Sequence, residues 1–434
     1  MTTILLNPVI ISIVLLCVMC ICKINVLLSI LVSALVAGLI SGIDVEDIMQ
    51  TFISGMGGNS ETALSYILLG TFAAAMTDTG VTAMLGSVMS KLVKENKYLL
   101  ILLIALLAMA SQNIIPIHIA FIPILIPPML GLMNKLKIDR RAIACTLAFG
   151  LKAPYITLPI GFGLIFQNLI KTSMEDNGLL VTSTQVWKSN LILGVGMLVG
   201  LLVALFLTYR KPREYSVVES NVSFETDEKF GKKQIIMIVA MIATFVVQLV
   251  FKSLPLGALV GLGIIFTLGA VKHHKMDTIL NEGVYLMGYI AFVMLVASGF
   301  AEVLKSTGGI ESFVNTVAPM LPPDKLILAT ILLITGLFVT IGIGTSFGTI
   351  PILAVLFVPL FVKLGFNAPE AIVVLSAAAA LGDAGSPASD TTLGPTAGLN
   401  ADGQHNHIFD TCIPTFLHFN IALILFALLG VILF

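Results

Sequence analysis

Residues 350–353 read Ile350-Pro351-Ile352-Leu353, and the same four residues stand at positions 122–125, which lie 228 residues earlier. The same shift superimposes three further pairs: Thr79-Gly80 on Thr307-Gly308, Lys97 on Lys325, and Lys135-Leu136 on Lys363-Leu364. Apolar residues coincide easily by chance in an apolar chain, whereas shared Pro, Gly and Lys positions do not. The sequence therefore predicts two copies of one structural unit.

The composition around this repeat is that of a membrane protein. Of 434 residues, 57% are hydrophobic and 11% are charged, against about 25% charged in soluble domains. Runs of about 20 apolar residues are needed to cross a bilayer. Such runs lie near 4–22, 24–42, 62–78, 187–209, 234–252, 255–271, 285–304 and 413–434. This pattern predicts an all-α polytopic membrane protein, with lipid as its surroundings, and excludes a water-soluble enzyme. The formal charge of -1 excludes nucleic acid as a partner.

Four further apolar regions are interrupted by Pro and Gly. Residues 98–134 and 326–364 are each long enough for two part-helices, and we expect each to form a re-entrant hairpin. Residues 141–170 and 371–398 are split at Gly150 to Gly163 and at Gly382 to Gly398, and we expect each to form a broken helix. Each half of the chain would then cross the membrane five times.

An odd number of crossings inverts the second copy relative to the first. Seven Lys and Arg flank the first hairpin and three flank the second, so the positive-inside rule places the first in the cytoplasm and the second outside. We predict an inverted repeat 1 at 1–209, a solvated cytoplasmic linker without chemistry at 210–233, and an inverted repeat 2 at 234–434. Both termini would lie outside the plasma (inner) membrane.

Unwound backbone at membrane depth must be satisfied by protein, water or a ligand. The two hairpin tips (Ser111 to His118 and Gly342 to Thr349) and the two helix breaks are the places where we expect it. In inverted-repeat transporters such breaks meet near the bilayer midplane and form the substrate site. We expect the same meeting point here.

The second break concentrates oxygen ligands in one stretch. Carboxylates and hydroxyls there suit a small cation, and a proton can compete for the carboxylates. The predicted cation ligands are Asp383, Ser386, Ser389, Asp390 and Thr391. The alternative is a break that is packed for structural reasons, in which Lys152 neutralises Asp383.

Lys152 occupies the corresponding break of the first half. Its ammonium could pair with Asp383, replace a second cation, or hold a substrate carboxylate, and His118 could relay a proton or hydrogen-bond at the hairpin tip. The predicted substrate-binding residues are Asn113, His118, Lys152, Thr345, Ser346, Thr349 and Thr392. We expect no cofactor and no metal beyond the transported cation, because Cys17 and Cys20 lack a second pair of ligands.

The pattern GD..SP.SDTT, from Gly382-Asp383 to Thr392, resembles the signature of the NhaC-type Na+/H+ antiporter family in the ion transporter superfamily. The stretch from Pro116 to Pro123 and Asp139-Arg140-Arg141-Ala142 resemble a subgroup that includes proteins regarded as amino-acid permeases. The resemblance covers nearly the whole chain. It implies two inverted repeats, a sodium site at Ser389, Asp390 and Thr391, and a homodimer with an elevator-like transport domain.

One position departs from the antiporter pattern, because Ala384 stands where a polar residue is expected and Lys152 adds a cation. We therefore predict a Na+- or H+-coupled secondary transporter of a small polar solute, most plausibly an amino acid. The alternative is a Na+/H+ antiporter that exchanges cation for proton at the same site. An intramembrane enzyme is disfavoured, because Ala380 breaks the GxGD protease pattern and the sequence has no HExxH motif.

Overall fold

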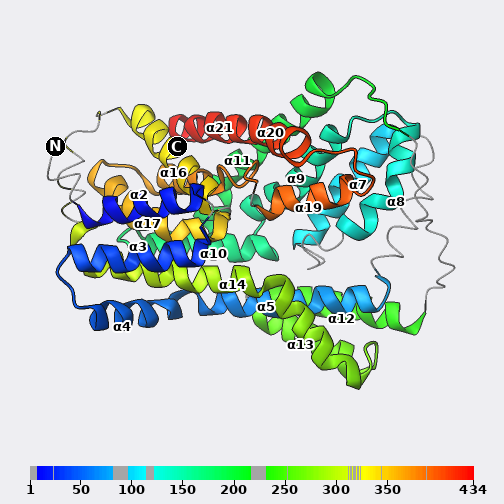
Figure 1. The fold of residues 1–434 in the computed structure, drawn as a ribbon, viewed down its shortest axis with the longest axis horizontal. Coiled ribbons are helices and arrows are strands. Elements are labelled where there is room, and N and C mark those ends of the chain that lie inside the picture. Colours follow the sequence, from blue (N-terminus) through cyan, green and yellow to red (C-terminus); the bar gives the residue numbers. More distant parts are fainter. Residues whose placement is uncertain are drawn as a thin grey trace.

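The computed structural model describes residues 7–22, 24–81, 96–113, 122–216, 231–251, 253–310, 324–343, 345–387 and 389–434, together with isolated positions between 312 and 322. Helices and short turns form this part of the chain, which contains no β-strand. Many of the long helices run roughly along the long axis of the molecule (Figure 1). The all-α fold class is confirmed.

The helices of the first half follow the predicted order. They are α2 (Pro8–Ile21), α3 (Val26–Ile40), α4 (Val45–Gly55), the 3₁₀ turn η1 (Met56–Asn59), α5 (Ser60–Asp78), α7 (Lys97–Asn113), α8 (Ile122–Lys135), α9 (Arg140–Thr157), α10 (Phe162–Asp176) and α11 (Ser183–Val203), which continues as the π-helix η3 (Ala204–Thr208). The first hairpin is represented by α7 and α8, and its tip at 114–121 lies outside the described residues.

The second half has a similar series. It contains α12 (Lys232–Phe251), α13 (Leu254–Thr267), the short η4 (His273–Lys275), α14 (Met276–Ser306), α16 (Lys325–Ile343), α17 (Ser346–Lys363), α18 (Ala368–Ala380) and α19 (Asp390–Leu399). The last span is η6 (His407–Cys412), α20 (Ile413–Thr415), η7 (Phe416–Asn420) and α21 (Ile421–Leu433). Helices α16 and α17 form the second predicted hairpin.

Local backbone structure repeats at the sequence shift of 228. Gly80 and Gly308 both have positive φ, at 74° and 64°, and so do Lys137 and Gly365, at 50° and 73°. Asp139 and Asn367 both cap the N-terminus of the following helix with a side-chain oxygen. The repeat therefore extends from residue types to backbone conformation. The inversion of the second copy and the domain limits stay predictions.

One helix, α4, was not predicted. Asp44 stands at its N-cap, Glu46 and Asp47 lie in its first turn, and Ile48 and Phe52 are its buried residues. It is a short amphipathic helix, so a search for long apolar runs misses it. At the 228 shift, residues 48–78 correspond to α14, which is a single helix of 31 residues. The first half therefore interrupts at η1 a helix that the second half keeps continuous.

Four helical stretches are long and apolar enough to cross a membrane: Ser183–Thr208, Met287–Ser306, Ser346–Lys363 and His407–Leu433. The pair α9 and α10 passes the same test together and is bent by 48°. Several shorter apolar helices lie beside them. The protein is thus a multi-pass membrane protein by its helices, while five crossings per half and the sidedness stay predictions.

The first helix break lies within the predicted interval and is narrower than it. The backbone unwinds at 158–161, between α9 and α10, whereas Gly150 is helical. A Cβ at Gly150 would lie 3.0 Å from the carbonyl oxygen of Ala105 and closer still to the Cβ of Ala108. Gly150 therefore permits close packing of α9 on α7 instead of breaking the helix, which corrects our interpretation of this glycine.

The second break is narrower than predicted. The backbone is non-helical at 381–387 and at 389, and Pro395 lies inside α19. Both helices next to this break belong to the core, because α18 is buried from Glu370 to Ala380 and α9 is buried along nearly its whole length. By contrast α2, α3, α12 and α21 expose many apolar side chains, as expected for helices that face lipid.

The start of the predicted linker is mostly exposed, but it is also anchored to the rest of the chain. Arg213 pairs with Asp410 at 2.8 Å, and Tyr215 accepts a hydrogen bond from the backbone N–H of Arg140 at 2.9 Å. The backbone of Ser216 bonds the side chain of Gln404 in both directions. Two charges of this segment have partners, because Arg213 meets Asp410 in η6 and Glu214 pairs with Lys137 before α9. Residues 217–230 lie outside the described residues.

Candidate functional site

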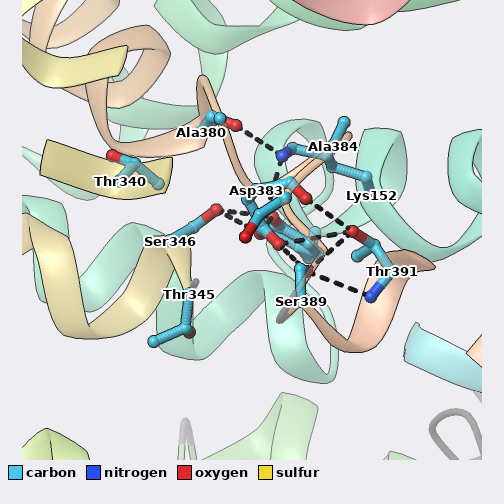
Figure 2. Close-up of polar contacts among 12 residues, drawn as sticks. Lys152, Thr340, Thr345, Ser346, Ala380, Asp383, Ala384, Ser389 and Thr391 are labelled. Atoms are coloured by element: carbon cyan, nitrogen blue, oxygen red, sulfur yellow. Dashed lines mark hydrogen bonds and ion pairs between the residues drawn. The ribbon is translucent and has the colours of Figure 1, made fainter. Parts of the chain in front are cut away.

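Helix α9, the start of α17 and the second helix break come together around Asp383. Lys152 and Tyr155 lie three residues apart on α9, so they share one face of that helix. Asp383 lies in the non-helical segment after α18, and Ser346 is the first residue of α17. Figure 2 shows the side chains of Lys152, Ser346, Ser389 and Thr391 converging on Asp383. We call Lys152, Tyr155, Ser346, Asp383, Ser389 and Thr391 the carboxylate site.

Both oxygens of Asp383 are hydrogen-bonded. Ser346 Oγ lies 2.5 Å from Oδ2, and Tyr155 Oη lies 3.0 Å from the same oxygen. Ser389 Oγ donates to Oδ1, and Thr391 Oγ1 lies 3.3 Å from it. Charge-assisted bonds of this kind hold a carboxylate ionised in a buried place. Asp383 is 5% exposed, and both of its oxygens are held by protein donors.

Lys152 is the cation beside this carboxylate. Its Nζ lies 3.5 Å from Asp383 Oδ2, and it donates a hydrogen bond to the carbonyl oxygen of Ala380 at the end of α18. The side chain of Lys152 is fully buried. The structure thus shows the pairing that we considered as an alternative for Lys152. A role for this ammonium in holding a solute stays a prediction.

The break itself is held by side chains from three directions. Asn420 accepts from the backbone N–H of Gly382 at 3.1 Å and donates to the carbonyl of Ala384 at 3.0 Å. Thr392 Oγ1 donates to the carbonyl of Ser386 or Ser389, at 2.5 and 2.9 Å. Gly382 has a φ of 80°, which a residue with a side chain rarely adopts. These bonds satisfy the peptide groups that the break frees from the helix.

Asp390, the second predicted carboxylate, differs from Asp383 in its surroundings. It is the first residue of α19 and is partly buried. Within the part of the chain that the structure describes, its carboxylate has no hydrogen-bond donor and no paired cation. The helix N-terminus is its main electrostatic support. The break therefore carries one neutralised carboxylate and one that still needs a positive partner.

The remaining predicted site residues are not part of the carboxylate site. Thr349 is buried and donates to the carbonyl of Thr345 at 2.7 Å, while Figure 2 shows Thr345 set apart from the bonds around Asp383. Ser386 Oγ donates to the carbonyl of Ile341 on α16 at 3.3 Å. Ser386 and Thr392 thus hold the break by hydrogen bonds to backbone carbonyls. His118 lies outside the described residues.

Asn113, predicted as a substrate-binding residue, lies against the first helix break. Its backbone packs on Gly161 at the first break, and its Nδ2 donates to the carbonyl of Met109 at 3.2 Å. Its Oδ1 is buried without a hydrogen-bond partner among the described residues. Asn113 lies 6% exposed. The structure therefore leaves one acceptor at the first hairpin tip that a ligand or water could satisfy.

Sequence reasoning missed Tyr155 and Asn420. A signal for Tyr155 was present, because Tyr155 corresponds to Asp383 at the shift of 228 and stands next to Lys152 in the same helix. A signal for Asn420 was its amide within the apolar last span. Sequence reasoning also missed an aromatic cluster, in which the centroids of neighbouring rings lie 5.2–5.8 Å apart. Its members are Tyr66, Tyr155, Phe162, Phe166 and Phe347.

The carboxylate site has the chemistry of a small-cation site. Hydroxyl groups that donate to Asp383 can rotate and offer their oxygens to a cation, and freed carbonyls add neutral oxygen ligands. Among the described residues no three His, Cys, Asp or Glu side chains are grouped so that they could hold a metal ion. The arrangement favours a hard cation or a proton that binds and leaves.

Comparisons with known proteins agree with this chemistry. A family model described as the Na+/H+ antiporter family matches residues 145–431, and a second, the Na+-H+ antiporter family, matches residues 7–93. An uncharacterized membrane protein of Vibrio parahaemolyticus is 47% identical over 97% of this chain and 98% of its own length. YuiF of Bacillus subtilis, whose name suggests an amino acid transporter, is 45% identical over the same shares.

Two solved structures share the fold. The YdaH transporter of Alcanivorax borkumensis has a TM-score of 0.61 at 12% identity and covers 89% of this chain and 88% of its own. MtrF of Neisseria gonorrhoeae, from a class of antimetabolite efflux pumps, has a TM-score of 0.58 at 14% identity and covers 89% and 84%. The chain is therefore a secondary transporter and not an enzyme, as predicted, with Na+ or H+ as the coupling ion. By these matches the chain belongs to the Na+/H+ antiporter family.

Proposed function

We propose that the protein moves a small polar solute, an amino acid, across the plasma membrane by alternating access, coupled to Na+ or H+. The observation that carries this proposal is the unequal state of two carboxylates in one break. Asp383 is matched by Lys152 at 3.5 Å, whereas Asp390 has no such partner among the described residues. An unmatched carboxylate in a membrane costs about 2.5–3.5 kcal/mol on insertion scales. A bound cation or proton removes that cost.

Coupling follows from this charge balance. With Asp390 empty, the break carries a net negative charge that opposes its passage through apolar surroundings. When a cation binds Asp390, with Ser389 and Thr391 as neighbouring oxygens, the break becomes neutral and can move. Binding of the ion then shifts the balance between the two access states. The solute would bind next to this break, so one movement carries both.

An amino acid suits the polar groups at hand. Lys152 could turn from Asp383 toward a solute carboxylate, while Ser346, Thr345 and Thr349 supply hydroxyls on α17. The name of YuiF supports the same class of solute. Hydroxyls with one buried ammonium fit a small zwitterion better than a large apolar molecule.

A Na+/H+ antiporter is the second candidate. It is favoured by the family to which the chain belongs and by Asp390, which can alternate between ion and proton without disturbing the bonds of Asp383. In this case no organic solute would occupy the site. The two candidates differ in what crosses the membrane, so one preparation can separate them.

The deciding experiment uses the purified protein in proteoliposomes. Uptake of each of the twenty ordinary amino acids, radiolabelled, is measured with an imposed Na+ gradient, an imposed pH gradient, or neither. Gradient-dependent uptake of at least one amino acid supports the proposal. No uptake, together with Na+-dependent dissipation of a pH gradient, would establish the antiporter instead.

We also propose the arrangement in the membrane. The charge distribution supports cytoplasmic hairpin flanks at α7 and α8 and both termini outside. Cysteines introduced at the ends of the chain, labelled with a membrane-impermeant reagent in intact cells, test this orientation. We propose a homodimer on the resemblance to the ion transporter superfamily. Mass measurement of the detergent-solubilised protein tests that state.

A further inference from the structure

A polar cavity of about 250 Å³ lies apart from the carboxylate site. One wall is formed by the end of α4, η1 and α14, and the other by α10 and α17. The side chains that give it its character are Ser54, Asn59, Asp176, Ser298, Glu302 and Lys305. Its volume is that of about eight water molecules, at about 30 Å³ each. A small solute such as an amino acid would fit within it.

The aromatic cluster separates this cavity from the carboxylate site. On α17, Phe347 belongs to the cluster, while Pro351 and Val355 line the cavity one and two turns further along. On α10, Phe166 belongs to the cluster, and Asp176 lies about 15 Å beyond it at 1.5 Å per residue. Helix α17 therefore passes from Ser346 in the site, through the ring layer, to the cavity, and α10 passes from the ring layer to the cavity.

The segment from η1 to α5 also passes from the cavity to the aromatic cluster. Tyr66 on α5 contacts the rings of Phe162 and Phe347, at 5.2 and 5.7 Å between centroids. Asn59, which lines the cavity, lies seven residues before Tyr66. Tyr66, Phe162 and Phe166 are each no more than 1% exposed. The rings thus close the cavity off from Asp383 in this conformation.

The charges of the cavity are mixed but not balanced. Lys305 Nζ lies 3.4 Å from Glu302 Oε2, and both side chains remain partly exposed. Asp176 forms no ion pair or side-chain hydrogen bond with any described residue. The cavity therefore presents two carboxylates and one ammonium, together with the hydroxyl of Ser298. Such a set can hold a zwitterion, whose ammonium meets the carboxylates while its carboxylate meets Lys305.

We propose that this cavity, which we call the vestibule, is a second binding site, where a zwitterionic amino acid is held before the aromatic cluster opens toward Asp383. The ammonium of the amino acid lies between Asp176 and Glu302, and its carboxylate takes Lys305 from Glu302. This inference rests on the proposed function, because it assigns the class of solute. By the predicted sidedness, the vestibule faces the outside.

The test labels one cysteine in the vestibule. Ser298→Cys is compared with Leu180→Cys, which lies in the loop after α10 and is 82% exposed, and with the unsubstituted protein for background from native cysteines. A cationic and an anionic thiosulfonate reagent of similar size are applied to proteoliposomes. We expect the cationic reagent to label Ser298→Cys several-fold faster than the anionic one, with little preference at Leu180→Cys. We also expect a transported amino acid to slow labelling at Ser298→Cys alone.

Transport measurements complete the test. Asp176→Asn and Lys305→Gln should each raise KM for amino acid uptake about tenfold or more, with maximal rate and Na+ dependence nearly unchanged, because the carboxylate site is intact. The vestibule is not a binding site if KM is unchanged in both variants, or if no transported amino acid slows the labelling. Either result leaves the proposed function standing. If the unsubstituted protein takes up no amino acid, the proposed function falls first, and the vestibule falls with it.

Discussion

Tyr155 donates its phenolic hydrogen to Asp383 across 3.0 Å, and the two residues occupy equivalent positions in the internal repeat, because their numbers differ by 228. The neighbouring bond from Lys152 to Ala380 joins another pair with the same difference. Both contacts join α9 to the end of α18 and to the break that follows it, through positions that the shift of 228 pairs.

Tyr155→Phe removes one of the bonds to Asp383 and keeps the ring in the aromatic cluster. We expect a loss of about 1 kcal/mol in stability and a weaker apparent affinity for the coupling ion, with transport retained. Uptake as a function of Na+ concentration measures the second effect. Tyr285→Phe, at an exposed ring on α14, is the matched control. An unchanged ion affinity in Tyr155→Phe would separate this hydroxyl from coupling.

Asp390→Asn removes the carboxylate that has no partner among the described residues. Because its side chain forms no hydrogen bond or ion pair with the described residues, we expect the melting temperature in detergent to stay the same or rise slightly. Coupled flux should fall to background, because the break no longer needs a cation to become neutral. Flux that still depends on the ion gradient, at the normal rate, in this variant would remove Asp390 from the ion site. Asp277→Asn, at an exposed acid on α14, controls for the loss of a charge.

Asp383→Asn leaves the fully buried Lys152 without its counter-charge. Breaking one side of a buried ion pair typically costs about 3–5 kcal/mol, so we expect a large drop in melting temperature together with loss of transport. The double variant Lys152→Met, Asp383→Asn should recover much of the stability but not the transport. A double variant that is no more stable than Asp383→Asn would show that the pair does not hold the break.

Gly382→Ala should disrupt the break by sterics. A Cβ there would lie 2.7–2.8 Å from Ile341 and from the carbonyl of Leu337 on α16, in addition to the strain of a positive φ. Gly403→Ala is the matched control, because its φ is 76° and a Cβ would meet nothing within 4 Å. We expect Gly403→Ala to cost about 1–2 kcal/mol, and Gly382→Ala clearly more. Equal melting temperatures would contradict the close contact of the break with α16.

His405 should make the stability depend on pH. It is buried in the loop after α19, and this burial lowers the pKa of His405 to about 4, with Arg140 and Arg213 acting in the same direction and Asp410 and Asp139 against it. In the unfolded chain the imidazole of His405 binds a proton near pH 6.5, whereas in the folded chain it remains neutral at that pH. Stability is therefore complete above about pH 6.5 and falls as the pH drops toward 4, by up to about 3 kcal/mol.

Melting temperatures between pH 4.5 and 7.5 measure this effect. His405→Gln should flatten the profile in that range, whereas His273→Gln, at an exposed histidine, should leave it as it is. A profile that keeps its slope without His405 would assign the dependence to another group. Carboxylates around the loop, such as Asp402, titrate at lower pH because of their ion pairs.

Much of the fold was predictable because its signals are local. Apolar runs gave most of the helices, and Pro, Gly and Lys at one shift gave the repeat. Asp383, Ser389 and Thr391 were predictable as a cluster because they lie within nine residues in sequence. The glycines were less informative: Gly382 marks a break, whereas Gly150 marks a close helix contact, and the sequence around them does not distinguish these two uses.

Partners that come from distant segments were not predictable from composition. Tyr155 and Asn420 reach the break from other helices, and no short motif announces them. Arg213 is anchored to Asp410 in η6 and Tyr215 to Arg140 on α9, and the charge pattern of the linker does not reveal these distant contacts. Helix α4 was missed because it is amphipathic and short, and its buried side carries only a few residues.

The interruption at Met56–Asn59 exists in the first half alone, since the corresponding stretch of α14 is continuous. If the two copies were identical, the inward-facing and the outward-facing states of the carrier would have the same free energy. The interruption at Met56–Asn59 is confined to one copy, so the two states should differ in free energy. The empty carrier should thus spend unequal times facing the two compartments. Its maximal rate of uptake should then differ from its maximal rate of export when each is measured with solute on one side only.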